Sequence, residues 1–227
     1  DIPYNYPLLG TSAVNDLFYG PGGVLYATTT GSTGGYPSTI WYTQDQGLNW
    51  TQTNLVFSPT LYSHNATYGI TADEAGYIYV TTDRGYILKS TTPAGTEFAM
   101  MPDLLGDILN SAKTIFVYQN NLFIPASNSI MYRSVDYDPV TGFTNIFACS
   151  PGAGSATTNE TVRAVWDPFN TKIILAVNAP DAIPPVANIL TAVFAGSSAI
   201  PETITNTNVL RFSSISSLDM PLPLSST

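Results

Sequence analysis

The sequence predicts an all-β fold, namely a β-propeller of about four four-stranded blades, with five blades as the alternative. Two observations favour this fold. Short apolar runs that follow a turn begin at Val24, Tyr77, Leu122 and Ile173, at spacings of 53, 45 and 51 residues. The chain is also rich in Thr, Ser, Tyr, Val, Ile and Gly, which suit strands and turns, whereas Lys occurs only three times. Repeats of this length with four strands each are typical of propellers.

Each repeat is expected to contain four strands joined by short turns. Pro, Gly, Asn and Asp separate the first two strands of every repeat, as in β-hairpins. The apolar runs are interpreted as inner strands covered on both faces by neighbouring blades, and the more polar fourth strands as outer strands that meet water. The expected strands span, in order, residues 17–19, 24–29, 40–43 and 50–53; 68–70, 77–82, 87–90 and 97–100; 115–118, 122–126, 130–134 and 143–146; and 162–166, 173–177, 189–193 and 202–204.

These strands divide the chain into an N-terminal arm or closing strand, a propeller and a C-terminal closing strand with a Pro-rich tail. Both ends are extended, apolar and rich in Pro, which is typical of docking arms. Pairing between residues near Val14 and residues 209–212 is a compatible alternative that would close the ring. The expected boundaries are 1–16, 17–206 and 207–227, with repeat units at 17–66, 67–113, 114–160 and 161–206.

Composition and charge exclude several classes of protein. Only 10% of the 227 residues are charged, and 7 Lys and Arg against 16 Asp and Glu give a net charge of −9. Nucleic-acid binding needs a basic surface that so few cations cannot build. No apolar run approaches the roughly 18 residues of a membrane span, and the aromatic content argues against disorder. Cys149 is the only cysteine and is interpreted as a small buried residue.

Three Asn-x-Thr sequons indicate an export route. They begin at Asn49, Asn65 and Asn159, which are the expected glycosylation sites. Together with the charge-poor, hydroxyl-rich composition, they predict a glycoprotein that is secreted, extracellular or displayed on a cell or virus surface.

One motif makes the fold prediction more specific. Residues 43–50 read Thr-Gln-Asp-Gln-Gly-Leu-Asn-Trp, of the form S/T-x-D-x-G-x-x-W, between the third and fourth expected strands. This motif resembles the Asp-box, or BNR repeat, of sialidase-type propellers, and degenerate copies follow at residues 90–98 and 134–143. The resemblance covers roughly residues 17–205. It implies a structural hairpin in which Thr43 begins the box, Asp45 caps turn amides, Gly47 adopts a conformation costly for side chains, and Trp50 fills the gap between strands.

The resemblance does not extend to the catalytic residues of sialidases. Those enzymes use three arginines around a substrate carboxylate, a Tyr nucleophile backed by Glu, and an acid/base Asp. This chain has four arginines, and the two within strands, Arg133 and Arg163, occupy different positions in their units. Asp136 and Asp138 resemble a short calcium loop, but a degenerate Asp-box turn explains them more simply. His64 is the only histidine. We therefore expect no catalytic residues, no cofactor and no metal.

The sequence thus predicts a non-catalytic β-propeller that acts in binding or as a structural subunit of an assembly. Its expected partner is a glycan or a protein, or further copies of the chain through the terminal arms. A sialidase-like glycoside hydrolase is the alternative. Tyrosines expected in loops or tails could stack on sugar rings, whereas the simpler interpretation is that most tyrosines fill blades; the loop and tail positions are Tyr4, Tyr6, Tyr36, Tyr62 and Tyr137.

Overall fold

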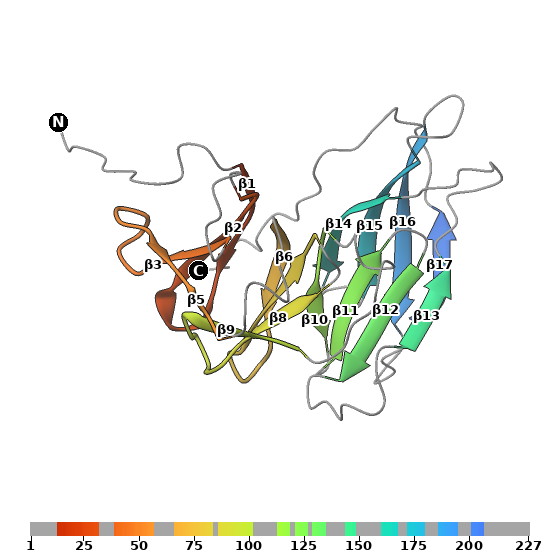
Figure 1. Cartoon of the computed structure of the whole chain (residues 1–227). Coiled ribbons are helices and arrows are strands. Elements are labelled where there is room, and N and C mark those ends of the chain that lie inside the picture. Colours follow the sequence, from red (N-terminus) through yellow and green to blue (C-terminus); the bar gives the residue numbers. More distant parts are fainter. Residues whose placement is uncertain are drawn as a thin grey trace, which may run out of the picture.

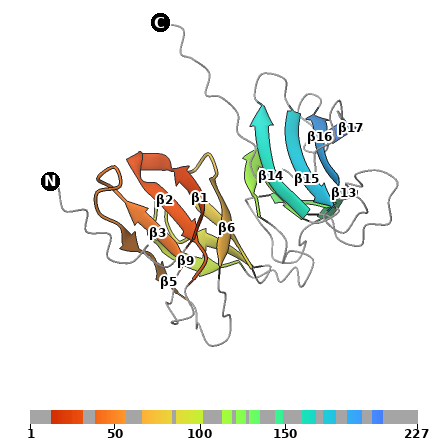
Figure 2. The same cartoon turned by 90° about the horizontal axis from the view of Figure 1, so that it is seen from above.

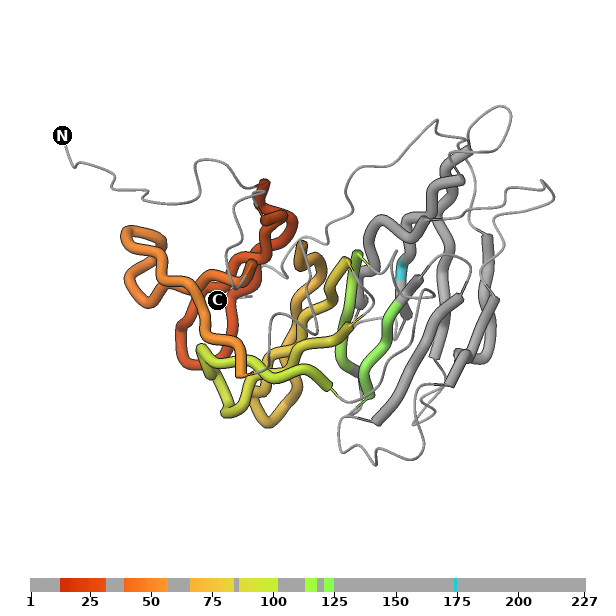
Figure 3. The backbone as a smooth tube through the Cα atoms, viewed as in Figure 1, coloured from red at the N-terminus to blue at the C-terminus, as the bar shows by residue number. Residues whose placement is uncertain are grey.

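The computed structural model shows an all-β chain made of short antiparallel sheets (Figure 1). Figure 3 traces the backbone through the first two sheets and the start of the third. In the part of the chain that it describes, no helix is long and apolar enough to span a membrane. The described residues are 13–31, 39–56, 66–83, 86–101, 113–118, 121–126, 129–134, 144–148, 160–167, 172–179, 186–194 and 201–206.

Four sheets follow one another along the chain, and their strands run in sequence order. The first sheet contains β1 (Val14–Tyr19), β2 (Leu25–Thr29), β3 (Ile40–Thr43) and β4 (Thr51–Gln52), with a short 3-10 turn at Pro21–Gly23. The second contains β6 (Thr67–Ala72), β7 (Ile78–Thr82), β8 (Ile87–Ser90) and β9 (Glu97–Met100). The third contains β10 (Phe116–Tyr118), β11 (Asn121–Ala126), β12 (Ser129–Ser134) and β13 (Thr144–Ala148). The fourth contains β14 (Glu160–Asp167), β15 (Lys172–Ala179), β16 (Val186–Phe194) and β17 (Pro201–Asn206).

The second sheet has a fifth strand that the repeat pattern does not predict. After β4 the chain leaves the first sheet, and β5 (Asn54–Leu55) pairs in parallel with β9. The backbone N–H of Asn54 donates to the carbonyl of Thr96 at 3.0 Å, and that of Val56 donates to the carbonyl of Phe98 at 2.9 Å. β5 therefore links the outer edges of two neighbouring sheets through two residues that carry no periodic signal.

The sheets pack side by side through their first strands. β1 contacts β6, as Figure 2 shows, β6 contacts β10, and β10 contacts β14. The first strands are thus the innermost. The predicted apolar runs instead form the second strands, β2, β7, β11 and β15, each hydrogen-bonded between a first and a third strand. All five residues of β7 are buried, because a strand in this position is covered by a neighbouring sheet on each face.

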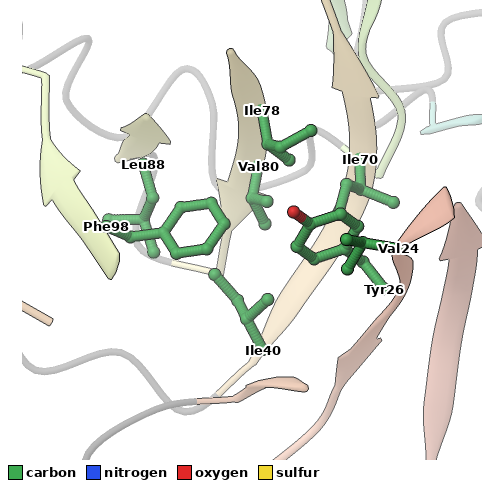
Figure 4. Packing of buried hydrophobic residues seen from close by; sticks show 8 residues of the cluster. All are labelled: Val24, Tyr26, Ile40, Ile70, Ile78, Val80, Leu88 and Phe98. Atoms are coloured by element: carbon green, nitrogen blue, oxygen red, sulfur yellow. The ribbon is translucent and has the colours of Figure 1, made fainter. Parts of the chain in front are cut away.

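The core consists of layers between sheets rather than one central cluster. Side chains of the first and second sheets point toward one another and meet in one cluster (Figure 4): Val24, Tyr26, Ile40, Ile70, Ile78, Val80, Leu88 and Phe98. A second cluster joins the second and third sheets: Tyr79, Ile87, Met101, Ile115, Leu122 and Ile124. Side chains alternate along β7, so that Tyr79 lies in one cluster while its neighbours Ile78 and Val80 lie in the other. Full burial of each such side chain contributes about 1.5–3 kcal/mol.

Candidate functional site

The turn between β3 and β4 is held by one carboxylate. Asp45 Oδ1 accepts hydrogen bonds from the Thr43 hydroxyl at 2.6 Å and from the backbone N–H of Asn49 at 2.9 Å. Asp45 Oδ2 accepts from the Asn49 side-chain amide at 2.7 Å. Both carboxylate oxygens therefore bond to groups of their own turn.

The backbone of this turn passes through the left-handed region. Gln46 has φ of 61° and Gly47 has φ of 92°. The Thr43 hydroxyl oxygen accepts from the backbone N–H of Gly47 at 3.1 Å and from that of Asp45 at 3.3 Å. These side-chain acceptors satisfy backbone donors that no strand partner reaches, so the turn has one well-defined conformation. Trp50, at the end of the turn, is partly buried.

Hydrogen bonding controls the ionisation of Asp45. The bonds from Thr43, and then those from Asn49, lower the pKa of the Asp45 carboxyl to about 2. Donors stabilise the charged form of a carboxylate, so Asp45 remains ionised over the physiological range. The depressed pKa, together with the two occupied oxygens, identifies a structural acceptor rather than a proton donor.

The predicted glycosylation site Asn49 lies inside this same turn. Its side chain is exposed, and its Nδ2 atom donates to Asp45. The N-glycan bond forms at that nitrogen, and a glycosylated amide keeps one N–H. Asn65 and Asn159 lie outside the described residues, but Thr67 of the second sequon is fully buried. Its hydroxyl donates to the Thr39 carbonyl at 2.9 Å, which links the first two sheets.

A second carboxylate organises the turn between β6 and β7, one of the hairpin turns expected between the first two strands of each repeat. Asp73 Oδ1 accepts from the backbone N–H of Tyr77 at 2.8 Å, and Oδ2 accepts from the Tyr79 hydroxyl at 2.8 Å. Gly76 in this turn has φ of 89°. The signal in the sequence is Asp73 three residues before Gly76, because β-turns favour Asp at the first position and Gly at the fourth.

The first degenerate motif copy forms a turn without a carboxylate. In the turn between β8 and β9, the Ser90 hydroxyl accepts from the backbone N–H of Ile78 and donates to the Thr92 carbonyl, both at 2.9 Å. Thr92 stands where the motif has Asp. The backbone N–H of Gly95 donates to the Thr92 carbonyl at 3.0 Å, so backbone bonding replaces the side-chain cap.

Turns of the first two sheets meet at one end of the molecule. The backbone N–H of Ala94 donates to the Gly76 carbonyl at 2.8 Å, and the Tyr26 hydroxyl donates to the Gly95 carbonyl at 3.2 Å. A Cβ placed on Gly76 would lie 3.6 Å from Pro21 and 3.3 Å from Pro93. The three turns are therefore held together by hydrogen bonds and close packing.

An apolar strip runs along β1, the innermost strand of the first sheet. It consists of Val14, Leu17 and Tyr19, which are 47%, 57% and 73% exposed. Leu17 and Tyr19 alternate with Phe18, which packs against the cluster shared with the second sheet. The two side chains thus project from the opposite face of the first sheet, away from the second.

The remaining candidates from the sequence are spread over the chain. The backbone of Arg133 lies in β12 opposite Leu122, and that of Arg163 lies in β14 opposite Ala176, so the two arginines belong to different sheets. The other candidates lie outside the described residues: Arg84, Arg211, Asp136, Asp138, His64, Cys149, Tyr4, Tyr6, Tyr36, Tyr62 and Tyr137.

Comparison with solved structures identifies the fold. YCF48 from Cyanidioschyzon merolae matches with a TM-score of 0.57 and 13% identity, over 86% of this chain and 56% of that one. The C-terminal WD40 domain of Sif2 matches with a TM-score of 0.51 and 11% identity, over 91% of this chain and 50% of that one. The chain has a β-propeller fold.

Other comparisons are consistent with this propeller but do not place it in a family. The extracellular domain of a one-component system protein from B. thetaiotaomicron matches with a TM-score of 0.57 and 15% identity, over 89% of this chain and 25% of that one. No protein-family model matches the chain, and no curated protein matches it. The propeller spans between a quarter and about half of the length of these three structures.

Proposed function

We propose that this propeller is a non-catalytic binding protein that engages a protein partner through the apolar strip of β1. The exposure of Leu17 and Tyr19 carries the proposal. Large apolar side chains next to one another on an ordered strand mark an interaction surface more often than isolated ones do. Removing apolar surface from water lowers the free energy by about 25 cal/mol per Å², so covering these side chains favours binding. Tyr is also enriched among the residues that contribute most to binding energy.

The structural setting of the strip also supports a protein partner. β1 is held on one side by β2 and on one face by the second sheet, so the strip is presented on a rigid strand. A preorganised surface loses little conformational entropy when it binds. The strip carries no charged side chain, which suits an apolar surface on the partner.

The turn at residues 43–50 is, we propose, an Asp-box, and this supports kinship with BNR-repeat propellers. The observation behind it is that Thr43 and Asp45 cap backbone N–H groups of the same turn. Because both oxygens of Asp45 are used within the turn, its role is to hold the hairpin and not to bind a ligand. We extend the proposal to location: the chain is a glycoprotein that is secreted or displayed on a cell or particle surface.

Photo-crosslinking tests the binding function directly. Benzoylphenylalanine replaces Tyr19 in the protein produced in its native source, and in a matched control it replaces Leu48, a 55% exposed residue of the β3–β4 turn. We expect a discrete crosslinked product from position 19 and none of the same mass from position 48. Equal labelling at the two positions, or none, would overturn the proposed function.

An assay with a fluorogenic sialoside separates binding from catalysis. We expect no turnover above that of the buffer at high protein concentration. Hydrolysis that depends on Arg133 or Arg163 would instead establish the sialidase-like alternative.

A further inference from the structure

We propose that the turn between β8 and β9 is an O-glycosylation site, and that Thr92 is the residue that carries the sugar. This inference rests on the proposed location, because a chain exported as a glycoprotein meets glycosyltransferases on its route. It adds a site and a linkage that differ from those of the Asn-x-Thr sequons. The co-reactant is a sugar activated by a diphosphate.

The reaction is the transfer of one sugar to a side-chain hydroxyl. A bond forms between Thr92 Oγ1 and the anomeric carbon of the sugar, and the bond between that carbon and the diphosphate oxygen of the donor breaks. The diphosphate leaves with the electron pair of the broken bond, and the hydroxyl proton passes to a base of the transferase. Nothing is oxidised or reduced, so the chain has to supply only an accessible hydroxyl with room around it.

Accessibility distinguishes this turn from most threonine positions in the described sheets. Thr91, Thr92 and Pro93 are three consecutive exposed residues. Threonines of the neighbouring strands, such as Thr67 and Thr82, are instead fully buried. A transferase has to enclose its acceptor residue, so a buried hydroxyl is excluded and an exposed turn qualifies.

The hydrogen bonds of the turn engage one of these two exposed hydroxyls and leave the other free. The Thr91 hydroxyl donates to the Glu97 carboxylate at 3.1 Å. Thr92 takes part through its backbone carbonyl, which accepts from the Ser90 hydroxyl at 2.9 Å and from the Gly95 N–H at 3.0 Å. Within the described part of the chain, the Thr92 hydroxyl has no hydrogen-bond partner. A sugar on this hydroxyl therefore breaks none of the bonds that hold the turn.

The residues that follow Thr92 leave room for a sugar. Pro93 comes directly after it, and Ala94 and Gly95 come next. A Cβ placed on Gly95 would lie 2.7 Å from Thr92 Oγ1, so a side chain at position 95 would crowd this hydroxyl. Segments rich in Thr and Ser that also contain Pro are typical of O-glycosylated chains. The sequence Thr-Thr-Pro-Ala-Gly-Thr at residues 91–96 has this composition and no charged residue.

The equivalent turn of the first sheet shows why position 92 is available. There Asp45 holds the turn through both carboxylate oxygens, and Asn49 donates to it. Thr92 stands where that motif has Asp, but backbone bonding replaces the side-chain cap. Its side chain therefore has no structural role in the turn. The two turns occupy the same place in neighbouring sheets, so sugars on Asn49 and Thr92 would lie at the same end of the propeller.

Glycopeptide mass spectrometry on protein from its native source tests the inference. N-linked sugars are first removed with an N-glycosidase, and the peptide that contains residues 91–96 is fragmented by electron transfer, which leaves the sugar on its residue. We expect a sugar mass on Thr92 and its loss in Thr92→Val. Thr91→Val is the matched control, since it removes a hydroxyl from the adjacent exposed residue and should leave the sugar in place. Circular dichroism of Thr92→Val should match the wild type, because the hydroxyl forms no bond in the turn.

A second measurement uses purified components and does not depend on the source. The folded, unglycosylated chain is incubated with a polypeptide N-acetylgalactosaminyltransferase and UDP-N-acetylgalactosamine as the sugar donor. We expect incorporation of the sugar at Thr92 and its loss in Thr92→Val. No incorporation into the folded chain, or incorporation that Thr92→Val leaves unchanged, would overturn the site.

The outcomes in the native protein separate this inference from the proposed location. An N-linked sugar at Asn49 together with an unmodified Thr92 would overturn the O-glycosylation site and leave the location standing. Both residues without a sugar would count against the two proposals together.

Discussion

At the scale of single residues, hydroxyl and carboxylate side chains in the described turns form hydrogen bonds with backbone groups. Asp45 and Asp73 each accept hydrogen bonds from a turn N–H and from a side chain of their own hairpin. Thr67, fully buried, bonds to Thr39 across two sheets. Only 10% of the residues of the chain are charged, and in the described turns short polar side chains make these bonds. Such caps satisfy buried or strained backbone groups that would otherwise be costly.

The pKa of Asp45 leads to a prediction about acid stability. Its folded value of about 2 lies below the ordinary value of about 3.9, so the unfolded chain takes up the proton first as the pH falls. The stabilisation is therefore complete above about pH 4 and is lost as the pH falls toward about 2. We expect the thermal midpoint of the wild type to fall more steeply across this window than that of Asp45→Asn, as measured by circular dichroism.

A surface carboxylate on another turn provides the control for this experiment. Glu74 is exposed on the β6–β7 turn. The substitution Glu74→Gln removes one negative charge, as Asp45→Asn does, and therefore serves as the matched control. If Glu74→Gln and Asp45→Asn flatten the pH profile equally, the hydrogen bonds of Asp45 contribute nothing specific.

At the scale of strands, the first strands of neighbouring sheets approach each other so closely that some positions have no room for a side chain. Gly69 lies in β6, where a Cβ would come within 2.6 Å of Thr114 Cα and 2.8 Å of the Ile115 nitrogen. Both atoms belong to backbone that leads into β10, and backbone cannot move aside as a flexible side chain can. The inner strands of the second and third sheets therefore require glycine at this point.

Replacement of Gly69 tests this contact. We expect Gly69→Ala to lower the free energy of unfolding by about 1–3 kcal/mol, because the added methyl group forces the two strands apart. The measurement is urea denaturation followed by intrinsic fluorescence. Ala72→Ser, at the other end of β6, tests whether any change in this strand has the same effect; equal losses would contradict the steric explanation.

At the scale of the whole molecule, sheets are stabilised by the sheets beside them. Clusters between the first and second sheets and between the second and third form most of the described core. In the first sheet, exposure on the face away from the second sheet is concentrated on β1, because Leu17 and Tyr19 are exposed while Ala27 is buried.

The proposed extracellular location makes a prediction about the mass of the whole chain. We expect protein from its native source to lose mass on treatment with an N-glycosidase, and Asn49→Gln to reduce that loss, because Asn49 is exposed and its amide keeps one N–H after glycosylation. Intact-protein mass spectrometry measures both. Asn54→Gln, an exposed Asn outside any sequon, is the control and should change nothing further. An unchanged mass would contradict the glycoprotein proposal.

Much of the fold could be predicted because turn residues and apolar runs in the sequence show where most strands begin and end. The ranges 40–43, 87–90 and 97–100 coincide with β3, β8 and β9, and every other expected strand overlaps an observed one. Turn residues and apolar runs determine these positions without help from distant parts of the chain. β5 could not be predicted, because two residues that pair with another sheet carry no pattern of their own.

The candidate site was predictable only in part, for the same reason. The motif at residues 43–50 pointed to the turn that Asp45 holds, since its hydrogen bonds all lie within eight residues. The sequence predicts a strand at residues 17–19 but not that Leu17 and Tyr19 are exposed, because exposure depends on which sheet lies beside β1. That neighbour is decided by contacts between residues far apart in the chain.

The sequence by itself determined most of the strands and turns and the spacing of the repeats, because hydrogen bonding and side-chain alternation within a hairpin involve residues close together along the chain. Only the tertiary structure decided which strand is innermost, where the fifth strand of the second sheet comes from, and which apolar side chains remain uncovered. The burial of a side chain depends on how the sheets pack against one another, and the spacing of the repeats in the sequence does not specify that packing.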